Sequence, residues 1–179
     1  MTFECSARLA LFELEAGADA AAGRLCAQLG PLAEKLGEGS ERAYAAAVGA
    51  AHATIVGTPD AEQQLDDAIA RLERIDARFL VPDLLGIVAE RLYRDELVDR
   101  ARDRAEAARA AADDVARPFE IARAHAVLAC IAAARGDGEA ARRHLEAVSP
   151  ASGSLPSHVE GLRQDAERLT AAIGRGLGG

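Results

Sequence analysis

A pattern of large and small apolar residues recurs in the sequence at intervals of about forty residues. It is clearest near the carboxyl end, where Leu128-Ala129 is followed by Ala141, Leu145 and Val148. Residues of similar size stand at the matching positions of three earlier registers: Val88, Ala89, Ala101, Ala105, Ala108; Val48, Gly49, Ala61, Leu65, Ala68; and Leu9, Ala10, Ala22, Cys26, Leu29. A period of this length is typical of helical repeat proteins, in which each repeat packs against its neighbours.

Within each repeat, apolar residues are three and four positions apart, which predicts amphipathic helices. No segment alternates apolar and polar residues as a half-buried strand does. Alanine, the strongest helix former, is the commonest residue, and prolines 59, 82 and 118 stand where helices begin. We therefore expect an all-α chain whose nine helices span residues 3–16, 19–36, 40–56, 60–77, 83–95, 97–116, 119–135, 138–148 and 156–173.

The small residues of the pattern indicate how the helices pack. An alanine or glycine at the point where two helices cross lets their backbones approach closely, and larger residues one turn away fill the space between pairs. This expectation concerns two sets of positions: 10, 49, 89 and 129 in the first helices, and 22, 61, 101 and 141 in the second helices. Substituting leucine for Gly49, Ala101 or Ala141 should therefore disturb the packing.

The chain resembles the tetratricopeptide-repeat superfamily in Leu128-Ala129, the turn Gly136-Asp137, and the residues Ala141, Leu145 and Val148. The resemblance implies a right-handed α-solenoid of about four antiparallel helix pairs with a C-terminal capping helix, in one domain spanning residues 1–173. Residues 174–179 would form a flexible glycine-rich tail. The period departs from the family's 34 residues, and non-aromatic residues fill the family's aromatic positions, as in the degenerate repeats of LuxR-type bacterial regulators. Another α-solenoid or an irregular helical bundle is the alternative.

Composition limits the partners that the chain would bind. The net charge is −8, and Lys35 is the only lysine, so we expect neither nucleic acid nor an anionic membrane to be the main partner. Three cysteines without a CxxC pair fit a reducing compartment. The sequence shows no signal peptide and no apolar run of membrane-spanning length. We therefore expect the protein to be cytoplasmic.

No motif in the sequence predicts catalysis. The four histidines lack the spacing of a zinc-binding helix, and the carboxylate pairs are adjacent in sequence, so their side chains point about 100° apart on a helix. Cys130 lies in an apolar stretch, which should raise its pKa and make it unreactive. We expect no enzyme activity, no metal and no cofactor.

The resemblance implies instead a scaffold that binds a peptide or helix of another protein on a concave face lined by the first helices. By the register above, this face includes Glu15, Asp83, Glu90, Tyr93, Arg94 and Arg123. The alternative is a ligand-sensing or oligomerising module of a larger regulator, which a closed pocket among the first helices would indicate.

The two ends of the chain are expected to differ. The last helix has one apolar face and one charged face, as a cap requires, whereas apolar residues lie on both faces of the first helix. We therefore expect Phe3 and Phe12 to contact another protein or a second copy of the chain, which would make a homo-oligomer.

Overall fold

In the computed structural model, which describes residues 2–36, 39–148 and 154–176, the chain is all-helical and those residues contain no strand. The α-helices are α1 (Phe3–Ala16), α2 (Asp19–Leu36), α3 (Ser40–Val56), α4 (Ala61–Arg74), α5 (Val81–Arg94), α6 (Val98–Asp114), α7 (Pro118–Ala134), α8 (Gly138–Ala147) and α9 (Ser157–Gly176), with a 3₁₀ turn, η1 (Arg78–Leu80), before α5. The expected all-α fold is confirmed, with helix ends shifted by up to three residues. In the described part of the chain, no helix is both long and apolar enough to cross a membrane.

The turns repeat with the forty-residue period of the sequence. A residue in the left-handed backbone region follows α1, α3, α5 and α7, at Gly17, Gly57, Glu96 and Gly136. The turns after α4 and α6 contain a second pair of such residues, Asp76 and Ala116. This conformation ends a helix by turning the chain, and glycine adopts it most easily. The helices therefore end at regular intervals even where the repeat carries another residue in place of glycine.

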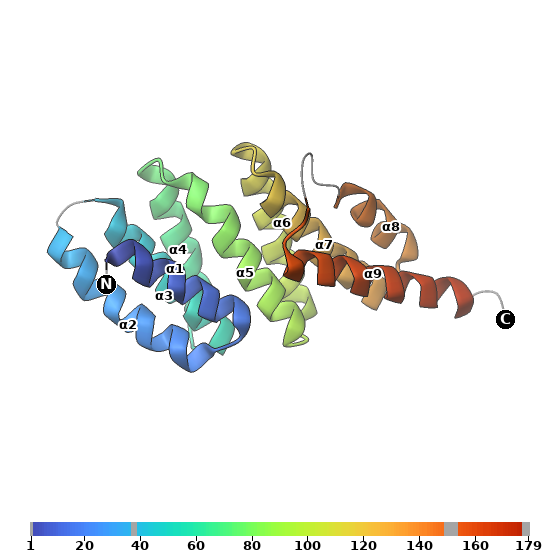
Figure 1. Cartoon of the computed structure of the whole chain (residues 1–179), viewed down its shortest axis with the longest axis horizontal. Helices are drawn as coiled ribbons and strands as arrows, with labels where there is room; N and C mark the ends of the chain where they lie inside the picture. Colours follow the sequence, from blue (N-terminus) through green and yellow to red (C-terminus); the bar gives the residue numbers. More distant parts are fainter. Residues whose placement is uncertain (1, 37–38, 149–153, 177–179) are drawn as a thin grey trace.

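The helices fall into two sets that alternate along the chain. The odd-numbered helices contact one another in succession, α1 with α3, α3 with α5, α5 with α7, and α7 with α9. The even-numbered helices α2, α4, α6 and α8 each pack against the odd-numbered helix that precedes them (Figure 1). In addition, α1 contacts α5, so the first helix lies closer to the middle of the chain than a regular repeat would place it. We call α1, α3, α5, α7 and α9 the inner set.

The small residues of the repeat are buried where helices meet. Ala10, Ala22, Ala61, Ala89, Ala101, Ala129 and Ala141 are each at most 3% exposed. One expectation is wrong: a side chain at Gly49 would meet open space rather than a neighbouring helix. Leu9 is 40% exposed, unlike Val48, Val88 and Leu128 at the matching positions. Helix α3 has room for a side chain at Gly49. Gly49→Leu should thus cost less than we expected from the sequence.

Helix α9 covers α7 and α8 with Val159, Leu162 and Ala166, all buried, and carries ion-paired residues such as Glu160 and Arg163 on its polar side. It extends to Gly176, so the expected tail at 174–179 is wrong for its first three residues, which are helical. Residues 177–179 lie outside the described part of the chain. The polar outer surface of α9 is consistent with a capping role.

Ala101→Leu and Ala141→Leu should each lower the free energy of unfolding by roughly 1–3 kcal/mol, because the added atoms have no space at a close helix contact. Urea denaturation measures this loss. Ala107→Leu, on the exposed side of α6, is the control and should change stability by less than about 0.5 kcal/mol. Equal stability of Ala101→Leu and the control would show that the helix contact has been misidentified.

Candidate functional cavity

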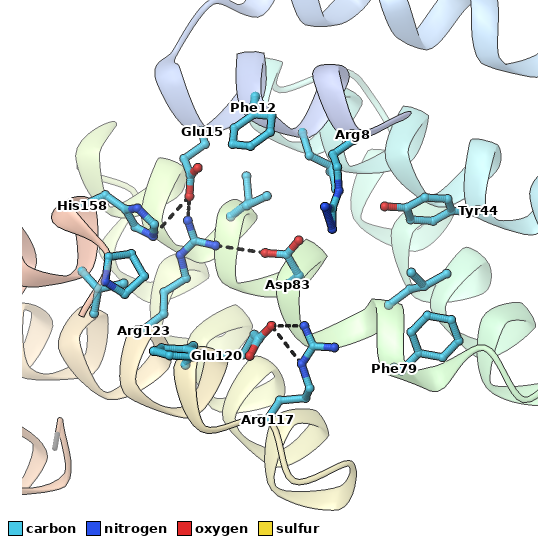
Figure 2. A pocket seen from close by; sticks show the side chains of 16 residues that line it. Arg8, Phe12, Glu15, Tyr44, Phe79, Asp83, Arg117, Glu120, Arg123 and His158 are labelled. Atoms are coloured by element: carbon cyan, nitrogen blue, oxygen red, sulfur yellow. Dashed lines mark hydrogen bonds and ion pairs between the residues drawn. The ribbon is translucent and has the colours of Figure 1, made fainter. Parts of the chain in front are cut away.

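A cavity of about 370 Å³ opens among the helices of the inner set (Figure 2). Residues from α1, α3, η1, α5, α7 and α9, and from the segments directly before α7 and α9, line it. They are Arg8, Leu11, Phe12, Glu15, Tyr44, Phe79, Leu80, Asp83, Ile87, Arg117, Phe119, Glu120, Arg123, Pro156, His158 and Val159. We refer to this set as the inner cavity.

Exposed aromatic side chains surround the inner cavity. Phe12 is 61% exposed, Phe79 53% and Phe119 42%. Tyr44 is half-buried and brings a fourth ring to the same lining. The whole sequence contains only six aromatic residues, so four of the six gather at one cavity. Exposure of a large apolar side chain to water is unfavourable, and clusters of exposed apolar side chains are often found at interaction sites of proteins.

One wall of the inner cavity is built around the guanidinium of Arg123, whose side chain is only 5% exposed. Its Nη1 lies 3.2 Å from Oδ1 of Asp83, its Nε donates to Oε2 of Glu90 at 3.2 Å, and its Nη2 pairs with Glu15. Three carboxylates from α1 and α5 thus surround one cation from α7. We call Arg123 with these three carboxylates the Arg123 cluster.

Gly86 on α5 allows Arg123 to lie across that helix. A Cβ atom at position 86 would stand 2.9 Å from Cδ of Arg123, closer than side-chain contacts allow. The glycine therefore brings the arginine stem against the α5 backbone, between Asp83 and Glu90 on the same helix. Burial lowers the pKa of Arg123 to about 10, which still leaves the guanidinium charged at neutral pH.

Two carboxylates of the Arg123 cluster, Asp83 and Glu90, are partly shielded from water. Burial raises the pKa of Glu90, with Arg94 and Arg91 opposing that rise, and it also raises the pKa of Asp83, which feels the charge of Glu120. Arg94 donates to Oε1 of Glu90 at 2.5 Å, so Glu90 lies between two arginines. Buried charges persist only when they are paired in this way.

His158 extends the cluster to α9. Its Nε2 lies 3.3 Å from Oε1 of Glu15, and burial together with the charges of Arg123 and Arg94 lowers its pKa to about 4. The ring is therefore neutral at neutral pH, and the contact with Glu15 is made by an uncharged imidazole. Potential ligand atoms of Glu15, Glu90 and His158 lie within 4.8 Å of one another, but Arg123 already pairs with both carboxylates. The Arg123 cluster is thus poorly suited to bind a metal cation.

The remaining charged residues of the lining are Arg117, Glu120 and Arg8. Arg117 donates to Glu120 at 3.1 Å. Arg8 is exposed, and Figure 2 shows its guanidinium in the cavity between Tyr44 and Asp83. Among the charged lining residues of the described chain, Arg8 is the one without an ion pair within 4.0 Å. The cavity therefore combines an aromatic rim with one cation available to a ligand.

The structure brings together most of the site residues that the sequence predicted. Glu15, Asp83 and Arg123 line the inner cavity. The buried Glu90 is not part of the lining but pairs with Arg123. Arg94 lies at the edge and donates to the backbone oxygen of Glu15 at 3.3 Å. Tyr93 lies outside this lining, close to Cys130, and burial raises its pKa to about 12.

Phe3 does not fit the expected exposed patch at the amino-terminal helix. It is 6% exposed and packs edge-on against Tyr44, with ring centroids 6.4 Å apart. The helix needs this side chain to bury its own apolar face against α3. Of the two phenylalanines expected at an interface, only Phe12 is accessible.

Residues that sequence reasoning missed contribute much of the cavity. They are Arg8, Tyr44, Phe79, Phe119, Arg117, Glu120 and His158. Two of them could have been suspected from the sequence. Phe79 and Phe119 stand beside the starts of α5 and α7, where the helix core does not require a large apolar side chain. Burial raises the pKa of Cys130 to about 12, as its apolar setting predicted, so this thiol is protonated at neutral pH.

Comparison of the chain with family models, curated proteins and solved structures finds no match.

Arg123→Met should lower the free energy of unfolding by roughly 3 kcal/mol, because three carboxylates would lose their common cation while Glu90 stays buried. Chemical denaturation at pH 7 measures this loss. Arg117→Met removes an ion pair of the same cavity whose arginine is 44% exposed, and it should cost less than about 1 kcal/mol. Adding Glu90→Gln to Arg123→Met should recover part of the loss. If Arg123→Met were as stable as Arg117→Met, the cluster would not be a structural link.

Stability should fall as the pH drops from about 6.5 towards 4, because the unfolded chain protonates His158 at its ordinary pKa while the folded chain resists protonation. The contribution of His158 is roughly 1–2 kcal/mol between pH 7 and pH 5. Unfolding measured across this range should show a smaller pH dependence in His158→Gln than in the parent. His125 and His144, whose pKa values are also lowered, should maintain the rest of the slope. Identical slopes in the two proteins would contradict the assignment.

Proposed function

We propose that the chain is a protein-binding scaffold whose helix pairs form a tetratricopeptide-like α-solenoid, with the inner cavity as its binding site. The alternating contacts of the helices and the regular left-handed turns support this architecture. The observation that carries the function is the gathering of Phe12, Phe79 and Phe119, all exposed, around one cavity. Aromatic side chains that are accessible and clustered are the groups that dominate binding energy at protein interfaces.

The occupant is a short amphipathic helix or peptide of a partner protein. Its apolar side chain would enter the space between the three phenylalanines. Binding there would remove the apolar surface of that side chain and of the phenylalanine rings from water. A carboxylate next to that side chain would pair with Arg8, since the other arginines of the lining already have acidic partners. The ligand is thus an apolar residue flanked by an acidic one. Because the net charge is −8, we still expect that neither nucleic acid nor an anionic membrane is the main partner.

Peptides selected from a random displayed library on the purified chain should share this apolar–acidic pattern, and their affinity can be measured by fluorescence anisotropy. Replacing Phe12, Phe79 and Phe119 together with serine should weaken binding by at least about a hundredfold, since each interface aromatic contributes roughly 1–2 kcal/mol. Arg8→Gln should weaken acidic peptides selectively and reduce the salt dependence of binding.

The matched control replaces two exposed apolar residues outside the cavity, Leu36 (58% exposed) and Ile75 (44% exposed), with serine. Binding by this variant should equal that of the parent, and both variants should retain the helical circular dichroism signal. Selected peptides that bind the triple serine variant as tightly as the parent would place the site elsewhere and refute the proposal.

The size of the cavity supports a second candidate, the sensing of a small aromatic carboxylate by a module of a larger regulator. A volume of about 370 Å³ lies in the range of small-molecule sites, roughly 300–1,000 Å³. A small aromatic carboxylate that raises the melting temperature of the parent, but not of the triple serine variant, would favour this candidate if no peptide class were enriched.

Self-association through the amino-terminal helix remains a proposal in a narrower form. It now rests on Phe12 and the 40%-exposed Leu9, because Phe3 is buried. Phe12→Ser should then lower the mass measured by light scattering.

The chain is proposed to act in the cytoplasm.

A further inference from the structure

Two histidines outside the inner cavity face each other across neighbouring helices. His125 on α7 and His144 on α8 have their Nδ1 atoms 3.0 Å apart, with ring centroids at 5.3 Å and the ring planes inclined by 42°. Both rings are half-buried. Only one of the two Nδ1 atoms carries hydrogen in such a contact, so the other presents a lone pair. The pair lies where α7 packs against both α6 and α8.

Burial, more than the charges around the pair, favours the neutral form of both imidazoles. Burial is the main cause that lowers the pKa of His125 and of His144, and Arg109 of α6 and Arg143 of α8 add to it. Asp113 and Glu106 of α6 and Asp137 at the start of α8 act in the opposite direction. Arg109 itself pairs with Asp113 at 2.8 Å and Arg143 with Glu139 at 2.6 Å, so neither cation is free to repel a metal ion strongly. Neutral imidazoles at neutral pH are the form that binds metals.

We propose that His125 and His144 form a two-histidine site for a divalent transition-metal ion of the zinc and copper class. Two imidazole nitrogens at zinc–nitrogen distances of about 2.0–2.1 Å in a tetrahedral arrangement lie roughly 3.3 Å apart. The observed separation of 3.0 Å is within a few tenths of an ångström of this spacing. Each ring would also rotate so that its Nδ1 lone pair points at the ion and not at the other nitrogen.

The proton balance of this step is simple. The ring that donates in the histidine pair moves its hydrogen from Nδ1 to Nε2, after which both Nδ1 lone pairs coordinate the ion and no net proton is released. Imidazole suits zinc, copper and nickel rather than magnesium or calcium. Water completes the coordination, and the nearby carboxylate of Glu106 contributes negative charge. Two protein ligands imply binding in the micromolar range, and the ion would link α7 to α8.

Calorimetric titration with ZnCl₂ tests the site in chain purified without a histidine tag and carrying Cys5→Ser, which removes an exposed thiol as a competing ligand. One ion should bind per chain. His125→Gln and His144→Gln should each weaken binding at least tenfold, whereas His52→Gln, on α3, is the matched control and should bind as the parent does. With CuCl₂, electron paramagnetic resonance should show coupling to two nitrogens in the parent.

A second measurement separates loss of the site from loss of the fold. Zinc should raise the melting temperature of the Cys5→Ser parent and of His52→Gln, but not of His125→Gln or His144→Gln, each compared with its own metal-free melt. Absence of binding at millimolar zinc, or equal zinc affinity in all four proteins, would overturn the proposal. Binding lost equally in His52→Gln would overturn it as well, because the ligands would then lie elsewhere. None of these outcomes depends on the inner cavity.

Discussion

The buried guanidinium of Arg123 is the interaction on which the arrangement of the inner set depends. It joins α7 to Glu15 on α1 and to Asp83 and Glu90 on α5, and Glu15 in turn contacts His158 on α9. These groups lie far apart in sequence, so their pairing fixes the relative positions of four helices. A buried arginine without such partners would cost several kcal/mol, and for this reason few alternative arrangements of the helices are compatible with it.

A second link of the same kind joins α1 and α5 at their ends. Arg91, which is 7% exposed, donates to the backbone oxygen of Leu14 at 2.7 Å and pairs with Asp19 at 2.8 Å. The carbonyl of Leu14 belongs to the last turn of α1 and also accepts from the backbone N–H of Gly17 at 3.2 Å. The arginine therefore adds a second donor at the end of α1 and holds that end against α5. This explains the contact between α1 and α5, which departs from the order of a regular repeat.

The elements that depend on local sequence were predictable, and those that depend on helix placement were not. Helix ends followed from Pro82, Pro118 and the glycines at turns, because capping and backbone preferences act within a few residues. The burial of the alanines at helix contacts followed from their spacing. The register also assigned Arg123 and Glu90 to one face, but it could not show that they pair, because ion pairing depends on how far neighbouring helices slide and rotate.

The errors have the same physical origin. Phe3 looked exposed because a single helix with two apolar faces has no visible partner, yet α1 packs against α2, α3 and α5. Gly49 looked like a crossing point because the pattern treats all repeats alike, whereas the space beside α3 is open. Phe79 was overlooked because it lies in the short turn η1 rather than on a periodic helix. In each case the missing information was the position of a neighbouring element.

The charged wall and the aromatic rim of the inner cavity would contribute differently to the binding of a ligand. Alanine contacts let the helices pack closely without large side chains, so the fold spends few of its six aromatic residues on its core. The wall formed by the Arg123 cluster is already paired and has little to gain by rearranging. Phe12, Phe79 and Phe119 are exposed and take no part in its ion pairs. A ligand that contacts the rim would therefore gain apolar burial without breaking a buried ion pair. A rigid charged wall beside an accessible aromatic rim is an arrangement that favours binding with little reorganisation of the free chain.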